Sequence, residues 1–298
     1  MELRVLHYFL AVAREQSISA AAESLHLSQP TLSTQLKALE QKLGKQLLIR
    51  GTKGSRKVIL TDEGIILRKR AEEILDLVKK AESEIQVADK SIAGDVYIGA
   101  GETDIIRLFA KAAQQLKQAY PDIHYHISSG NSAFVLEQLD KGLIDFGLVY
   151  SSVDHTKYES IDVPIKDTFG VLMRKDSALA KKEFVCPEDL WDKPLIMSHQ
   201  DEQDGWPIAE QIRKDITKLN IIATYNLLYN GSLLVAEGLG YAVCFDKIIN
   251  TTGDRNLCFR PIKPEIETTP LIVWKKYQVL SKAAKKFLNQ LYKVFNSL

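Results

Sequence analysis

Residues 17–44, SISAAAESLHLSQPTLSTQLKALEQKLG, carry the pattern that decides the fold of the N-terminal part. The three alanines at 20–22 let a neighbouring helix approach closely, and Ser28 is a typical helix N-cap. Pro30 then falls in the first helical turn, where proline is tolerated. The following helix has one leucine face, made by Leu32, Leu36, Leu39 and Leu43. Two helices joined by a short turn, with another helix expected over 3–15, predict a helix-turn-helix.

The face of the second helix opposite the leucines is small, polar and basic. It carries Pro30, Ser33, Thr34, Lys37 and Gln41. No bulky side chain prevents this face from entering a DNA major groove about 12 Å wide. An ordinary solvated helix face would look the same, but the next segments favour DNA binding. Strands predicted at 47–50 and 57–60 flank a basic, glycine-containing turn, and such a hairpin is typical of a wing that contacts phosphates.

A long helix is predicted after the wing, with Thr61 as its N-cap. Apolar residues recur along it at strict four-three spacing: Leu67, Ala71, Ile74, Val78, Ala81, Ile85 and Ala88. This is the heptad pattern of a coiled-coil seam. A helix of about 30 residues extends about 45 Å, which is longer than one small domain can cover. We therefore expect the seam to pack on a second subunit, with packing on its own C-terminal domain as the alternative.

The formal net charge of +1 over 298 residues averages segments of opposite sign. Residues 1–60 contain nine Lys or Arg and four Asp or Glu, for a net charge of +5. Residues 61–92 contain six basic and eight acidic residues, and the remainder contains 24 basic and 26 acidic residues. Each of these two parts therefore has a net charge of −2. Positive charge is therefore concentrated in the predicted helix-turn-helix, which favours a nucleic-acid partner there.

Cysteine usage and hydropathy indicate the cellular compartment. Cys186, Cys244 and Cys258 form neither a disulfide framework nor a zinc-binding pair, so reduced thiols are expected. The apolar stretch at 5–13 fits a helix face better than a signal peptide. The longest uncharged run, 219–236, contains three asparagines and is no membrane span. These features predict a cytoplasmic protein without a membrane partner.

Beyond residue 94, predicted strands alternate with predicted helices, which indicates βαβ units and a largely parallel sheet. Loops at 99–103 and 129–132 follow two of the strands, where open α/β sheets bind ligands. The hydroxyls of Thr103 and Ser132 beside helix N-termini would suit a carboxylate or another anion, and plain N-capping is the alternative. Glu102 would oppose an anion if its side chain points inward.

Several spaced motifs agree with one family pattern at once. They are Ser17 to Ala22 with Leu25, Ser28 to Ser33, Leu39-Glu40, Leu43-Gly44, Leu47, Arg50, Leu60 to Gly64, Gly142, Asp145-Phe146 and Val235 to Gly240. On these residues the sequence resembles the LysR-type transcriptional regulators over essentially its whole length. The wing departs from the family pattern, because it looks longer than the commonest form.

The resemblance implies an α/β fold class with a mainly α N-terminal part and three segments. These are a winged helix-turn-helix at 1–60, a dimerising linker helix at 61–92 and an effector-binding domain at 93–298. The effector domain would resemble periplasmic binding proteins, with lobe I at 93–163 and 266–298 and lobe II at 164–265. The chain would cross between the lobes near 163 and 266.

The same resemblance implies a bacterial, sequence-specific DNA-binding regulator of transcription, assembled as a homotetramer built from two dimers. A small-molecule effector between the lobes would control how the oligomer engages the promoter. The expected partners are double-stranded promoter DNA, further copies of the chain and the effector. No cofactor, metal or catalytic residue is expected.

Three sets of candidate site residues follow from the motifs and the resemblance. The DNA-binding set is Ser28, Gln29, Pro30, Thr31, Ser33, Thr34, Lys37, Arg50, Lys53 and Arg56. The effector-binding set is Gly101, Glu102, Thr103, Gly130, Asn131, Ser132 and Ser198. The dimer-seam set is Leu67, Ala71, Ile74, Val78, Ala81 and Ile85.

An enzyme is the competing class of protein. Gly99-Ala100-Gly101 after a strand suggests a dinucleotide loop, but Asp104 stands where the third glycine would be. His124 and His126 lie on one face of a predicted strand and fit a sheet surface better than a metal site. A stand-alone solute-binding protein would share the two lobes, but it would need an export signal and would have no use for residues 1–60.

Overall fold

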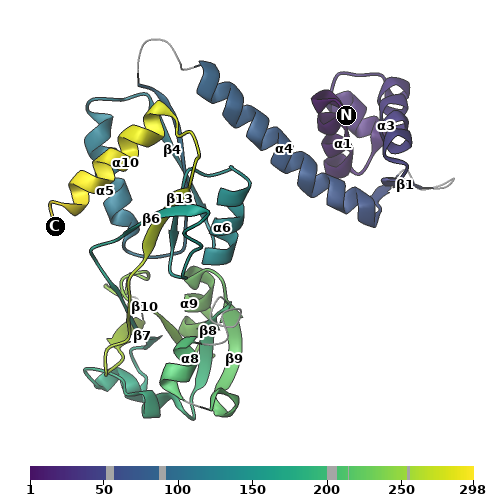
Figure 1. Cartoon of the computed structure of the whole chain (residues 1–298). Coiled ribbons are helices and arrows are strands. Elements are labelled where there is room, and N and C mark those ends of the chain that lie inside the picture. Colours follow the sequence, from purple (N-terminus) through teal and green to yellow (C-terminus); the bar gives the residue numbers. More distant parts are fainter. Residues whose placement is uncertain (52–56, 87–91, 200–206, 214, 254–255) are drawn as a thin grey trace. The chain divides into compact units, whose positions relative to one another are not determined.

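The computed structural model describes residues 1–51, 57–86, 92–199, 207–213, 215–253 and 256–298 (Figure 1). The chain divides into two compact units, Met1–Gln86 and Val87–Leu298. In the described ranges, no helix combines the length and the apolar character that a membrane crossing requires.

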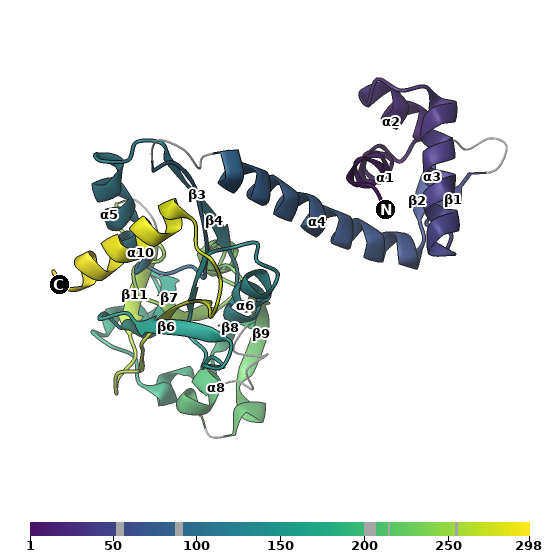
Figure 2. The same ribbon diagram turned by 45° about the horizontal axis from the view of Figure 1, so that its top comes forward.

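The N-terminal unit is a helix-turn-helix with a hairpin and a long helix. Its described elements are α1 (Leu3–Glu15), α2 (Ile18–Ser24), α3 (Gln29–Leu43), β1 (Leu48–Arg50), β2 (Val58–Leu60) and α4 (Asp62–Gln86) (Figure 2). Ser17 caps α2 and Ser28 caps α3, each by accepting a bond from a backbone N–H three residues on. Gly44 ends α3 in the left-handed region at φ 65°, which glycine adopts without steric cost.

The core of this unit lies where α1, α2 and α3 meet. Phe9 and Val12 of α1, Ala21 of α2, and Leu32 and Leu36 of α3 are at most 1% exposed. The predicted leucine face is thus confirmed at these two positions and at Leu39, which is 4% exposed. Leu43 at the end of the helix is 42% exposed, because the chain turns away at Gly44. Strands β1 and β2 pair antiparallel, which confirms the predicted hairpin.

The C-terminal unit contains two sheets, and each sheet forms the centre of one lobe. The first sheet has the order β4 (Ile123–Ser129), β3 (Gly94–Ala100), β5 (Phe146–Val149), β13 (Leu271–Lys275) and β6 (Tyr158–Asp162). The second has the order β11 (Leu257–Pro261), β7 (Asp167–Arg174), β10 (Tyr241–Phe245), β8 (Pro194–Ser198) and β9 (Asn220–Tyr225), and β12 (Glu267–Thr268) pairs with β7. We call the parts around these sheets lobe I and lobe II.

Each lobe combines parallel and antiparallel strand pairs. In lobe I, β3 is parallel to β4 and β5, whereas β13 is antiparallel to β5 and β6. In lobe II, β8 is parallel to β9 and β10, whereas β7 is antiparallel to β10 and β11. The parallel pairs follow from the alternation of strands and helices. The pattern did not predict β6 and β11, two edge strands with partly exposed residues.

The chain passes from lobe I to lobe II between β6 and β7 and returns between β12 and β13. The last helix, α10 (Lys282–Phe295), therefore packs beside α5 (Ile106–Lys117) on lobe I (Figure 1). Phe287 of α10 anchors this contact against the rings of Phe109, Tyr125 and Phe146, with centroids 5.4–5.9 Å away.

Two helices of the C-terminal unit differ from the sequence prediction at their starts. Helix α6 (Ser132–Asp140) is capped by Asn131, whose side chain accepts a bond from Phe134 N at 3.0 Å, rather than by Ser132. Helix α9 (Leu228–Ala236) begins four residues before Ser232, where the sequence pattern predicts its start. A short helix, α8 (Pro207–Ile212), lies beside β8 and β9 in Figure 1.

Candidate functional site

The N-terminal half of α3 presents a solvent-facing polar surface. Gln29, Pro30, Thr31 and Lys37 are exposed, and Ser33 is half-buried. Ser28 Oγ and Thr31 Oγ1 lie 2.7 Å apart, and both remain exposed. Thr34 Oγ1 donates to Pro30 O at 2.9 Å within the helix, so this hydroxyl already has an intrachain acceptor. The surface is compatible with a helix that enters a DNA groove.

Arg50, a predicted DNA contact, is held by Glu40 of the same unit. Arg50 Nη2 lies 3.1 Å from Glu40 Oε2, and the two side chains are 33% and 15% exposed. Glu40 Oε1 also accepts bonds from Leu47 N at 2.9 Å and Leu48 N at 3.1 Å. Glu40 therefore joins the end of α3 to the first strand of the wing, and it neutralises the charge that Arg50 would offer to a phosphate. No local sequence signal indicated this role of Glu40, because its partners lie seven to ten positions along the chain.

Two other predicted contacts, Lys53 and Arg56, lie outside the described residues, as does Ala88 of the predicted seam. Along α4, the seam residues do not share one environment. Ala71 is fully buried and Leu67 packs on the helix-turn-helix core, because α4 contacts α1. Ile74 and Val78 are half-buried, Ala81 is exposed and Ile85 is 75% exposed. The first turns of α4 thus complete the core of their own unit, and an apolar side chain remains uncovered farther along.

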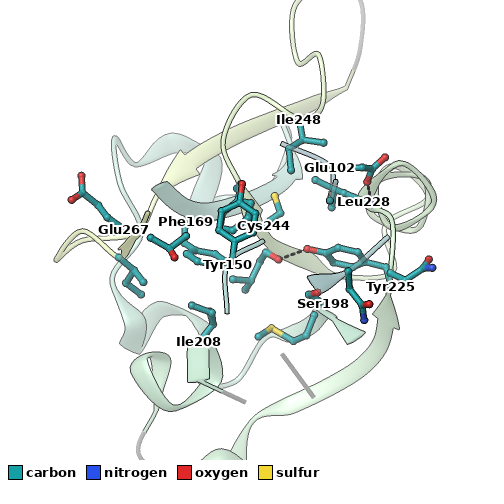
Figure 3. Close-up of a pocket in the computed structure, with 18 of the residues that line it drawn as sticks. Glu102, Tyr150, Phe169, Ser198, Ile208, Tyr225, Leu228, Cys244, Ile248 and Glu267 are labelled. Carbon is teal, nitrogen blue, oxygen red and sulfur yellow. Dashed lines mark hydrogen bonds between the residues drawn. The ribbon is translucent and has the colours of Figure 1, made fainter. Parts of the chain in front are cut away.

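The C-terminal unit has a pocket of about 320 Å³ between its two lobes (Figure 3). Lobe I contributes the loops after β3, β4 and β5, and lobe II contributes the ends of β8, β9 and β10 with α8 and α9. These are carboxyl ends of parallel strands, which is where open α/β sheets bind ligands. The volume lies at the lower end of the range for small-molecule sites.

The pocket brings together most of the predicted effector residues. Gly101, Glu102, Gly130, Asn131 and Ser198 all line it. Thr103 and Ser132 do not, which departs from the expectation for their hydroxyls. Both are buried, at 6% and 5% exposure, and Ser132 Oγ accepts a bond from Tyr150 N at 3.1 Å.

Asp167, at the start of β7, accepts a hydrogen bond from the Thr103 hydroxyl. Thr103 Oγ1 donates to Asp167 Oδ2 at 2.7 Å, and the hydroxyl of Tyr150 donates to the same oxygen. Burial raises the pKa of the Asp167 carboxyl, and the two hydroxyl donors act in the opposite direction. Burial and the neighbouring carboxylate raise the pKa of Tyr150. This buried cluster ties lobe I to lobe II behind the pocket, and the local sequence offered no signal for it.

Glu102 makes a second connection between the lobes. Its carboxylate accepts a hydrogen bond from Leu228 N, at the first residue of α9 (Figure 3). A carboxylate at this position is favourable, because the N-terminus of a helix carries partial positive charge. Glu102 lines the pocket, so its predicted opposition to an anionic ligand stays a prediction about a residue at the right place.

The back of the pocket is apolar and aromatic. The ring of Phe245 lies 4.8 Å from that of Tyr150 and 4.3 Å from that of Phe169, between centroids. Cys244 also lines the pocket, and burial raises the pKa of its thiol. Because the thiolate is the reactive form, this cysteine is a poor nucleophile at neutral pH. Within the described ranges, no cluster of His, Cys, Asp and Glu is suited to a metal ion.

Family models match both units. One described as a bacterial regulatory helix-turn-helix protein of the lysR family matches residues 3–65. Another, described as a LysR substrate binding domain, matches residues 89–296. The HTH-type transcriptional regulator BsdA of Bacillus subtilis (strain 168) is 29% identical over 302 residues, which cover 97% of this chain and 99% of that protein.

A second relative and two solved structures agree with this assignment. The DNA-binding transcriptional dual regulator OxyR of Escherichia coli (strain K12) is 31% identical over 212 residues, or 71% of this chain and 67% of that protein. Full-length CbnR complexed with its target DNA has the same fold, with a TM-score of 0.76 at 19% identity over 99% of this chain and 100% of that chain. Full-length BenM has a TM-score of 0.55 at 24% identity, covering 100% of this chain and 96% of that chain.

Proposed function

The chain belongs to the LysR family of bacterial transcriptional regulators, and from this premise we propose that a small molecule in the inter-lobe pocket adjusts its hold on promoter DNA. It is a DNA-binding regulator with an effector-binding domain. The observation that carries the finer proposal is the pocket itself, because closing or opening it moves one sheet against the other. A ligand that fits one lobe arrangement better than another shifts the population toward that arrangement.

We propose that the exposed start of α3 reads base edges in the major groove. Gln29 has an amide that can pair with adenine through two hydrogen bonds, worth about 1–3 kcal/mol of discrimination. The hydroxyls of Thr31 and Ser33 lie on the same stretch, and Lys37 offers a charge for a phosphate. Arg50 stays in the proposed set only as a weaker contributor, because Glu40 already holds its guanidinium.

The test of this reading is a comparison of specific and random DNA. Duplexes selected from a random-sequence pool by the full chain supply the specific site. We expect Gln29→Ala and Ser33→Ala to lose affinity for the selected duplex more than for random duplexes. Gln35→Ala is the matched control, since Gln35 is a glutamine of the same helix that lies outside the polar face predicted to enter the groove. Equal losses on both kinds of DNA would refute a base-reading role.

We further propose that the chain dimerises through α4 and that two dimers associate as a tetramer. The support is the heptad spacing along α4 together with the exposure of Ile85 in the single chain. A twofold dimer predicts a partly palindromic site with half-sites one DNA turn apart or a multiple of it. Footprinting on the selected duplex measures this spacing, and a single unrepeated half-site would contradict the dimer.

A catalytic role is not proposed for this chain. The named relatives are transcriptional regulators. The effector should therefore bind and dissociate unchanged. Recovery of a chemically altered ligand after incubation with the full chain would revive the enzyme hypothesis.

A further inference from the structure

The described lining of the inter-lobe pocket carries negative but no positive charge. Two lining residues are acidic, Glu102 and Glu267, and none of the described ones is Lys, Arg or His. Glu267 is paired with Lys166, whose Nζ lies 2.8 Å from the carboxylate. Glu102 has no cationic partner in the described ranges, and Figure 3 shows it on the opposite side of the pocket from Glu267. Its charge therefore remains available to a ligand.

The N-termini of two helices at the pocket, α9 and α6, are already bonded to side chains of the chain itself. The carboxylate of Glu102 accepts from Leu228 N at the start of α9. The side chain of Asn131 accepts from Phe134 N at the start of α6. These amides are what would otherwise attract an anion. In the sequence, free helix N-termini and the hydroxyls of Thr103 and Ser132 favour an anionic ligand. In the structure, the amides at the starts of α9 and α6 and both hydroxyls are bonded to other groups of the chain.

The apolar wall of the pocket suits a cation that carries an apolar body. The rings of Tyr150, Phe169 and Phe245 form one continuous aromatic cluster. Aromatic faces attract ammonium groups through the ring quadrupole, most strongly where water is excluded. Ile208 and Leu228 extend the apolar surface on the lobe II side. A carboxylate beside aromatic rings is a common way to hold an organic ammonium.

We propose that the pocket binds a small organic ammonium ion with an apolar body, and that Glu102 is its counter-ion. The proposal rests on the proposed function, which assigns the effector to this pocket. The ammonium would lie between the Glu102 carboxylate and the aromatic cluster. The apolar body would fill the space toward Ile208.

Three probes of the same skeleton test the charge preference: phenethylammonium, phenethyl alcohol and phenylacetate. Their binding to the full chain is measured by titration calorimetry at millimolar concentrations. We expect the ammonium to bind at least about tenfold more tightly than the alcohol, and phenylacetate to bind most weakly. Tightest binding by phenylacetate, equal binding by all three, or no binding by the ammonium would overturn the proposal.

Glu102→Gln identifies the counter-ion. The glutamine oxygen can still accept from Leu228 N, so the variant keeps the contact with α9 and loses only the charge. We expect the advantage of the ammonium over the alcohol to disappear while the affinity for the alcohol stays unchanged. Asp104→Asn is the matched control. Asp104 belongs to the same loop, but its carboxylate does not line the pocket. An advantage that survives in Glu102→Gln would remove Glu102 from this role.

The outcome separates this inference from the proposed function. If phenylacetate binds and changes the affinity for DNA, the ammonium preference is wrong and the regulatory role of the pocket stands. If the ammonium binds with the expected preference and the affinity for DNA does not respond, the regulatory role fails and the ligand assignment stands.

Discussion

Replacement of Glu40 by alanine should destabilise the N-terminal unit and leave the C-terminal unit unchanged. The carboxylate accepts bonds from Leu47 N at 2.9 Å, Leu48 N at 3.1 Å and Arg50 Nη2 at 3.1 Å. Leu47 and Leu48 are at most 2% exposed, so their amides have little access to water once the acceptor is gone. A buried donor left without a partner costs about 1–3 kcal/mol. Because some water can enter, we take the lower end, or roughly 2 kcal/mol for both amides.

The ion pair with Arg50 adds less, because the guanidinium is one-third exposed and solvent screens it. Partly exposed pairs contribute about 0–1 kcal/mol. The total for Glu40→Ala is therefore about 2–3 kcal/mol. For a unit of this size, that corresponds to a melting temperature lower by about 10–20 °C. Glu40→Gln keeps an acceptor for both amides and loses only the pair, so we expect a shift of about 5 °C or less.

The three tryptophans, at 191, 206 and 274, make the assay selective, because all belong to the C-terminal unit. Far-ultraviolet circular dichroism follows the helices of both units, and tryptophan fluorescence follows the C-terminal unit alone. We expect Glu40→Ala to lower the midpoint temperature of the transition seen by circular dichroism. The midpoint temperature seen by tryptophan fluorescence should not change. Arg50→Ala is the matched control for the ion pair. If Arg50→Ala lowered the melting temperature as much as Glu40→Ala does, the bonds from the two amides would not explain the loss of stability.

Three further predictions concern DNA affinity, assembly and pH. Lys37→Ala should reduce the slope of log affinity against log salt by about 0.9, whereas Arg50→Ala should change it less, and equal slopes would contradict the pairing with Glu40. Ile85→Lys should weaken the dimer in sedimentation analysis, while Ile66→Lys, also exposed but off the seam, should not; identical profiles would contradict the α4 interface. Burial raises the pKa of Asp167 above its ordinary 3.8, so its contribution to stability is full below that pH and is lost as pH rises toward the folded-state pKa. Asp167→Asn should therefore gain stability relative to the native chain as pH rises above 3.8, and a pH-independent difference in denaturant melts would rule this out.

The helices of the N-terminal unit and their order could be predicted because their signals are local. Caps at Ser17 and Ser28 and a stop at Gly44 act within one turn of the residue itself. The leucine face of α3 follows from the helical period alone. Likewise, glycine-containing loops after two strands indicated that Gly101, Glu102, Gly130 and Asn131 would gather at one sheet edge, and they line the pocket.

The pairing of side chains across the fold could not be predicted in the same way. Arg50 looked like a free cation in a basic hairpin, and only the packing of β1 against the end of α3 gives it Glu40 as a partner. Thr103 looked like a ligand-binding hydroxyl, but it is bonded to Asp167, 64 positions away. Secondary-structure patterns repeat over a few residues, whereas these partners meet only when distant segments of each unit have packed together.

The sequence by itself determined the identity of the parts: a helix-turn-helix, a long apolar-striped helix and an α/β domain. These depend on periodicity and caps, which are properties of short segments, whereas the division of the α/β domain into two lobes was implied only by the resemblance to a family. Only the tertiary structure decided which charged side chains are paired within the chain and which can interact with a ligand or with DNA. The chain crosses twice between the lobes, and this brings Glu102 to the start of α9, 126 positions away. The electrostatic character of the pocket is set by that contact, because a charge acts through distance in space and not through distance along the chain.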